Sequence, residues 1–208
     1  MEDFFRSKGR TIQKRMTVVR LSDQSLLLHS PVGLTKQLQG RLEVLGEVRH
    51  VISPNTFYFS FLNDYLAVYP EARFYAPPGR VLSNCAVLKD GPEPVWEQDL
   101  DQVIFLSRIL KEAVFFHRLS QTLILTDLCR NIQEEAPFLT KTLARFTGSY
   151  QRFTDYPFVR WTLSDRPAAR AALQKILNWD FERIILAQGR IVEGKGKENL
   201  RQAFAWLE

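Results

Sequence analysis

Residues 102–127 read QVIFLSRILKEAVFFHRLSQTLILTD. Apolar residues dominate three segments of strand length within this stretch, at residues 102–106, 113–117 and 122–127. The spacers between these segments are too short for the crossover connection that parallel strands need. The stretch therefore predicts an antiparallel meander of three strands.

Upstream of the meander, strand-like segments alternate with helical ones. The expected strands are residues 16–21, 25–29, 48–52 and 72–76. Leucines at helical spacing predict a helix that ends at Gly46, and a second helix over residues 61–69 is stopped by Pro70. A β-α-β-α-β order is typical of a sheet covered by helices.

Downstream, residues 131–164 are the least regular part and are interpreted as an insertion or connection. Asp165 is a good N-cap for a helix through Asn178, followed by a strand at residues 183–186 and a helix at 198–207. The predicted fold class is α/β of mixed α+β character. We expect a basic N-terminal arm (residues 1–15), mobile and solvated, followed by a single domain (residues 16–208).

Composition limits the class of protein. The chain has 208 residues, 45% hydrophobic and 25% charged, which is ordinary globular usage and excludes a collagen or a disordered chain. The net charge of +5 permits an anionic partner without requiring one. Two cysteines cannot form a disulfide framework, and no apolar run approaches the ~20 residues of a membrane span. These features predict a cytoplasmic protein with no membrane span.

Several polar residues stand where an apolar strand ends, which is where ligand sites collect in layered α/β folds. They are His29, Asn55, His117, Asp127 and Gln188. Tyr58 is added as a possible hydrogen-bond donor, and these six form the predicted ligand pocket. Each also has a structural interpretation: a carboxylate or imidazole bonded to nearby backbone, or a tyrosine that only packs.

The order of elements resembles the metallo-β-lactamase fold, an αββα sandwich, and is similar to a bacterial branch of that superfamily with no assigned function. The similarity spans residues 16–207 and rests on the segments LLLHSP (26–31), SPN (53–55), YPEARFYAPPG (69–79), EAVFFHR (112–118), TLILTDL (122–128) and WDFERIILAQG (179–189).

The resemblance also implies that the metal site has degenerated. Catalytic members carry a His-x-His-x-Asp-His loop, but here the corresponding segment is PNTFYF (54–59), with no histidine or carboxylate. The late His-Gly of the family is Gln188-Gly189. Only His117 and Asp127 fall at ligand positions, and the resemblance implies that they point into one cleft. Since a catalytic zinc usually needs three protein ligands, we expect neither metal nor another cofactor.

The sequence therefore favours a non-catalytic binding or scaffolding protein, a pseudoenzyme without catalytic residues, whose partner is an unknown small molecule or protein. The alternative is a hydrolase that holds zinc or another divalent metal through His117, Asp127 and a further ligand such as His29. The aromatic and basic stretch 145–161 is interpreted as core cover or protein contact. Nucleic acid binding is disfavoured, and binding of an anionic polymer by the basic arm is a weaker hypothesis.

Overall fold

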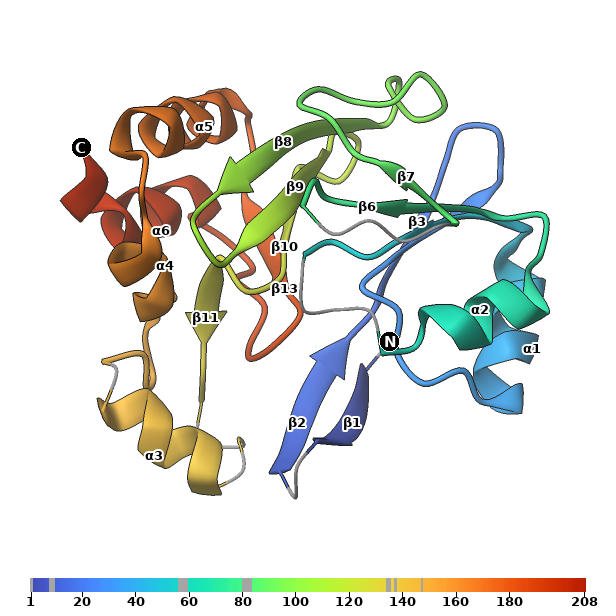
Figure 1. The fold of residues 1–208 in the computed structure, drawn as a ribbon, viewed down its shortest axis with the longest axis horizontal. Coiled ribbons are helices and arrows are strands. Elements are labelled where there is room, and N and C mark those ends of the chain that lie inside the picture. The colour runs from blue at the N-terminus through green and yellow to red at the C-terminus, as the bar shows by residue number, and fades with distance from the viewer. Residues whose placement is uncertain are drawn as a thin grey trace.

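Two β-sheets pack face to face, with helices on both outer sides, in the computed structural model (Figure 1). The structure describes residues 2–7, 10–55, 60–79, 84–133, 136, 138–146 and 148–208, and the side chains of 2–7, 10–13 and 143 are left aside. This arrangement confirms the predicted αββα sandwich.

The first sheet has the strand order β3 (Thr17–Arg20), β4 (Leu26–His29), β5 (Val48–Ile52), β6 (Arg73–Ala76) and β7 (Cys85–Val87). The hairpin β3–β4 is antiparallel, and the remaining pairs are parallel. The helices α1 (Lys36–Leu45) and α2 (Leu62–Val68) cover its outer face. The Thr35 hydroxyl caps α1 by accepting from the Leu38 N–H at 3.1 Å.

The second sheet contains the predicted meander. Its order is β13 (Arg183–Leu186), β10 (Thr122–Leu125), β9 (Lys111–His117) and β8 (Leu100–Leu106). The pairs β8–β9 and β9–β10 are antiparallel, and β10–β13 is parallel. The helices α5 (Arg166–Asn178) and α6 (Gly196–Ala203) cover its outer face, and a 3₁₀ turn at Ala205–Leu207 follows α6. Asp165 caps α5 as predicted, accepting from the Ala168 N–H at 2.9 Å.

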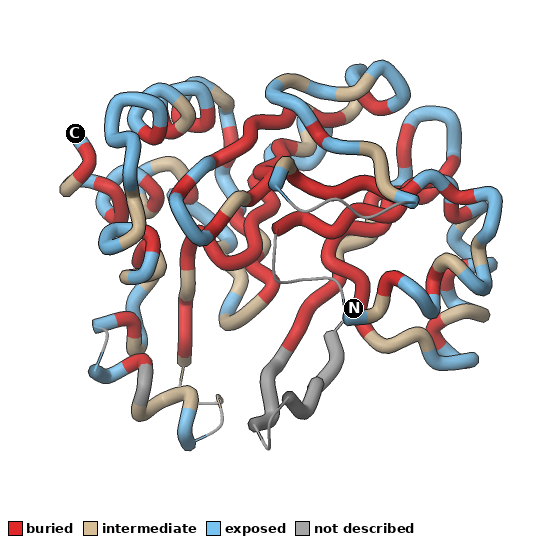
Figure 2. Tube along the Cα trace, in the orientation of Figure 1, coloured by how far each residue is buried: buried red, intermediate tan, exposed pale blue. Residues whose placement is uncertain are grey.

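Three apolar clusters correspond to the layers of the sandwich. The cluster between the sheets joins Leu27 and Ile52 of the first sheet to Phe115 and Ile124 of the second. One outer cluster lies under α1 and α2, and the other lies under α5 and α6. Figure 2 shows the sheets as the most continuously buried part of the chain.

Two segments are more regular than predicted. The basic arm contains an antiparallel hairpin, β1 (Glu2–Ser7) and β2 (Arg10–Arg15), in place of the expected mobile end. The stretch after residue 128 contains β11 (Cys129–Asn131), α3 (Phe138–Phe146), β12 (Phe153–Asp155) and α4 (Pro157–Thr162). Strands β11 and β12 pair with each other as a further two-stranded sheet.

Candidate functional site

One edge of the sandwich gathers most of the predicted pocket residues. His29 is the last residue of β4, and Asn55, Asp127 and Gln188 come shortly after the ends of β5, β10 and β13. Since parallel strands end at a common edge, residues that follow them come together there. Asn55, after β5 of the first sheet, donates a hydrogen bond to Asp127, after β10 of the second sheet. This bond joins the two sheets at the edge.

The centre of this edge is a buried cluster of Asn55, Asp127 and a residue that the sequence analysis missed, Glu112. The Asn55 amide nitrogen donates to Asp127 Oδ2 at 3.0 Å and to the Thr126 hydroxyl at 2.9 Å. It also lies 3.5 Å from Glu112 Oε2. The amide therefore links the two carboxylates.

Glu112, at the start of β9, holds the loop that follows β10. Its oxygens accept from the backbone N–H groups of Thr126 (2.7 Å), Asp127 (2.8 Å) and Leu128 (3.0 Å). Burial and the neighbouring Asp127 carboxylate raise the pKa of Glu112 to about 7, although these N–H donors favour the ionised form. Glu112 is thus a structural acceptor whose charge is costly at its position.

Asp127 is buried between positive groups. Burial raises the pKa of Asp127, while Arg130, the Asn55 hydrogen bond and Lys14 act in the opposite direction. Lys14, near the end of β2, is itself buried, and desolvation lowers its pKa although Asp127 favours the charged form. Arg130 also lies over the Tyr156 ring, 3.5 Å from its centroid. The positive charges of Arg130 and Lys14 therefore act on the Asp127 carboxylate, which the fold resemblance would make a metal ligand.

His29 ends β4 in a fully buried position. Its ring contacts Phe115 edge to face, with centroids 5.5 Å apart. Burial lowers the pKa of His29 to about 3, so the ring is neutral at ordinary pH. Its Nε2 and the adjacent Ser30 hydroxyl are buried with no hydrogen-bond partner among the described residues.

The loop around Gln188 lies against the N-terminal hairpin. The Arg15 guanidinium donates to the carbonyls of Leu186 at 2.5 Å and Gly189 at 3.0 Å, and the Arg15 N–H donates to Ala187 at 2.9 Å. The basic arm was expected to be solvated, yet Lys14 and Arg15 are buried because they pack against this edge. Gln188 is half-buried, and Tyr58 lies outside the described residues.

His117 is not part of this cluster, so the expectation of one cleft shared with Asp127 is wrong. His117 ends β9 and pairs with Thr122 at the start of β10, whereas Asp127 follows the far end of β10. An antiparallel hairpin necessarily separates these two positions. The His117 ring nitrogen Nδ1 lies 2.7 Å from the Ser120 hydroxyl.

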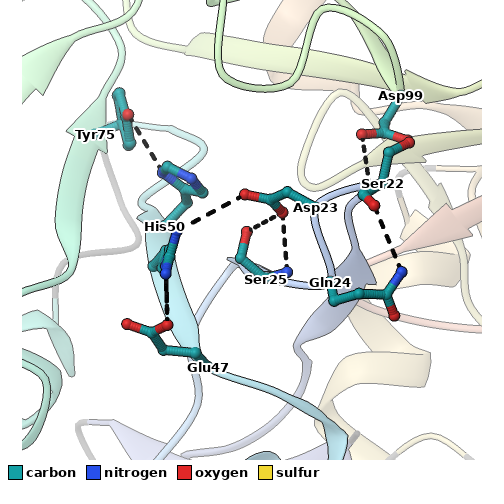
Figure 3. A network of polar contacts seen from close by, with 9 residues as sticks. Ser22, Asp23, Gln24, Ser25, Glu47, His50, Tyr75 and Asp99 are labelled. Atoms are coloured by element: carbon teal, nitrogen blue, oxygen red, sulfur yellow. Dashed lines mark hydrogen bonds and ion pairs between the residues drawn. The ribbon is translucent and has the colours of Figure 1, made fainter.

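The surroundings of His117 include Asp99, which belongs to a second polar network (Figure 3). The Asp99 carboxylate accepts from the Ser22 N–H at 3.0 Å and from its hydroxyl. Figure 3 also shows His50 of β5 facing the Tyr75 hydroxyl, 3.4 Å away. This network lies at the turns of the β3–β4 hairpin, away from Asp127.

An NMR titration of His117 tests its separation from Asp127. Burial lowers the pKa of His117, and Asp99 raises it. We therefore expect Asp99→Asn to lower the His117 pKa further, and Asp127→Asn to leave it unchanged. A shift of the His117 titration in Asp127→Asn would contradict the register of the hairpin.

The described residues at the Asp127 edge do not by themselves make up the donor set of a metal ion. Within the described parts of the chain, no three His, Cys, Asp or Glu side chains gather in a way that could hold one. Glu112 is occupied by backbone donors, Asp127 is bonded to Asn55, and His117 lies elsewhere. The cluster is bonded internally, which differs from the open coordination position of a catalytic zinc site.

The two packed sheets with helices on their outer faces define a protein of metallo-β-lactamase-like fold. The structure resembles metallo-β-lactamases from Hirschia baltica (12% identity, TM-score 0.61, 99% of this chain and 91% of that one) and Pontibacter korlensis (10%, 0.61, 99% and 92%). It also resembles the Flv1 flavodiiron core from Synechocystis sp. PCC6803 (16%, 0.61), matching 96% of this chain and 53% of the other. At these identities the likeness shows the fold alone.

The family is given by a match over most of the sequence. The family model described as "Domain of unknown function (DUF4336)" matches residues 10–157, and the chain belongs to this family. None of the curated proteins matches the chain significantly. Among the described residues, no helix has the length and apolar character needed to cross a bilayer.

Proposed function

We propose that this protein is a non-catalytic binding or scaffolding protein that uses the edge occupied by the active site in its fold relatives. The observation that carries the proposal is the internal bonding of the two carboxylates. Glu112 accepts from three successive backbone N–H groups, and Asp127 accepts from Asn55. Their lone pairs stabilise the protein itself, so they are poorly placed to ligate a metal that acidifies water.

The polar atoms left over at this edge support a binding role. His29 Nε2 and the Ser30 hydroxyl are buried and unpartnered among the described residues, and a buried polar group without a partner is costly. A small polar molecule or a peptide segment of a partner that bonds to them would remove this cost. The ligand itself is not specified by these two atoms.

The alternative is a hydrolase with a reduced metal site. The unpartnered, neutral His29 favours it, since neutral imidazole is a common metal ligand. His117 is too far along the hairpin to contribute with Asp127, so this alternative depends on His29, Asp127 and groups outside the described residues.

Elemental analysis of protein purified without chelators separates the two functions. We expect less than about half an equivalent of zinc, iron or manganese per chain, because three-ligand closure is missing. One tightly held equivalent that is lost in Asp127→Ala but kept in Asp180→Ala would overturn the binding proposal. Asp180 is a suitable control because its side chain is 87% exposed.

A further inference from the structure

The base of the N-terminal hairpin joins the first sheet to the second at the Asp127 edge. Thr17, at the start of β3, pairs with His29 at the end of β4, so residues 14–16 continue past the end of β4. From this position the Arg15 guanidinium donates to two carbonyls of the second sheet, at the end of β13 and in the loop after it. Residues 14–16 are called the strap below.

The strap is held in different ways on its two sides. Met16 is fully buried in the apolar cluster under α1 and α2, where its sulfur accepts from the Tyr65 hydroxyl at 3.5 Å. Towards the second sheet the contacts are polar, because Arg15 donates to backbone carbonyls and Lys14 interacts electrostatically with Asp127. Apolar burial anchors the strap to the first sheet, whereas hydrogen bonds to the second sheet are exchanged for water at a modest net cost.

The Arg15 contacts join a weakly supported segment to a fixed loop. Among the described strands, β1 and β2 pair only with each other, and the hairpin that they form projects from the sandwich (Figure 1). A two-stranded hairpin is marginally stable by itself. The loop after β13 is fixed by β11, because the Arg190 N–H donates to the Asn131 carbonyl and the Asn131 amide donates to the Arg190 carbonyl, both at 2.9 Å. Loss of the Arg15 contacts would therefore move the strap and leave this loop in place.

Two unpartnered polar groups lie beside the strap. His29 pairs with Thr17, the residue that follows the strap, and Ser30 comes next in the chain. His29 Nε2 and the Ser30 hydroxyl are both buried with no hydrogen-bond partner among the described residues. A buried polar group without a partner is costly, and a ligand reaches such a group only after a neighbouring segment has moved. The strap is the neighbouring segment with the weaker attachment on one side.

We propose that the strap is a latch that closes the Asp127 edge, and that release of Arg15 from the loop after β13 gives a ligand access to His29 and Ser30. An occupant that bonds to these two groups binds the open state better than the closed state, so it shifts the population towards the open state. The inference rests on the binding function proposed above and adds how access to that site is controlled.

Chemical modification of His29 tests the latch in the full chain. Diethyl pyrocarbonate acylates a neutral imidazole that it can reach, and peptide mass spectrometry separates His29 from the other two histidines. At neutral pH we expect Arg15→Gln to raise the rate of modification at His29 at least about tenfold over the wild type, because the strap loses two hydrogen bonds from a charged donor. His117 is half-buried at the far end of β10, and its rate should not change.

Arg118→Gln is the matched control variant. Arg118 also donates to two backbone carbonyls, those of Glu97 and Gln98, and it pairs with Asp101, away from the strap. This variant should react at His29 like the wild type. The wild type gives a second test that does not depend on the folding of a variant. In low concentrations of urea, the rate at His29 should rise much less steeply than the population of unfolded chain, because opening of the strap exposes little surface.

The latch is overturned if His29 reacts in the wild type only in proportion to global unfolding, or if Arg15→Gln and Arg118→Gln react at His29 at the same rate. These outcomes leave the proposed binding function standing, because the metal content of the purified protein decides that function. One tightly held equivalent of metal would overturn the binding function in a separate experiment, so the two proposals fail independently.

Discussion

Replacing Glu112 with alanine is expected to lower the free energy of unfolding by about 3 kcal/mol or more, because buried backbone donors lose their acceptor. The reason is the number of donors that lose their acceptor. The N–H groups of Thr126, Asp127 and Leu128 all point at the two Glu112 oxygens. Alanine leaves these donors buried without a partner, at about 1–3 kcal/mol for each one that no water reaches.

Denaturant unfolding of Glu112→Ala and wild type measures the loss directly. Glu71→Ala is the control, because Glu71 is exposed in a loop and should change stability by less than about 0.5 kcal/mol. Amide hydrogen exchange gives a local readout, since the N–H groups of residues 126–128 should exchange faster in the Glu112 variant. A loss below about 1 kcal/mol with unchanged exchange would show that Glu112 does not hold this loop.

The meander was predictable because its information is local. Three apolar runs separated by short polar spacers allow few arrangements, and β8, β9 and β10 form as predicted. The same pattern also predicts that His117 lies far from Asp127. Once residues 113–117 and 122–127 form a hairpin, the end of the first strand lies beside the start of the second. His117 and Asp127 could therefore have been separated from the sequence alone.

Glu112 was missed for a different reason. In the sequence it is one charged residue before the apolar run of β9, where a solvated side chain is the common outcome. Its partners are backbone N–H groups 14–16 residues further along, and backbone donors leave no mark in a sequence. Lys14 and Arg15 were missed in the same way, because their contacts are carbonyls and a carboxylate that only the folded edge brings near. These contacts could therefore be identified only from the tertiary structure.

The second large effect is expected at His29 and appears as a dependence of stability on pH. Burial lowers the pKa of His29 from 6.5 to about 3. Between these values the unfolded chain binds a proton at His29 and the folded chain does not, so protonation favours unfolding. The stabilisation is complete above pH 6.5 and is lost as the pH falls towards 3. Its slope is about 1.4 kcal/mol per pH unit, or on the order of 5 kcal/mol over the whole window.

Glu112 contributes with the opposite sign. Since its pKa is raised from 4.5 to about 7, the folded chain holds the extra proton between these values, and stability falls as the pH rises through them. The two groups partly cancel between pH 4.5 and 6.5, so the wild-type profile alone does not isolate either. The difference between wild type and His29→Gln does, because Glu112, His50 and His117 are present in both proteins.

We expect the difference in unfolding free energy between wild type and His29→Gln to be constant above pH 6.5. Below pH 6.5 it should shift against the wild type by about 1.4 kcal/mol per unit, as measured by urea unfolding in steps of half a pH unit. His117→Gln is the matched control, and its profile should differ less because His117 is only half-buried. Parallel profiles for wild type and His29→Gln would mean that His29 takes up its proton without unfolding. The imidazole would then be accessible to solvent, and its Nε2 would no longer be a neutral, desolvated group held for an occupant of the Asp127 edge.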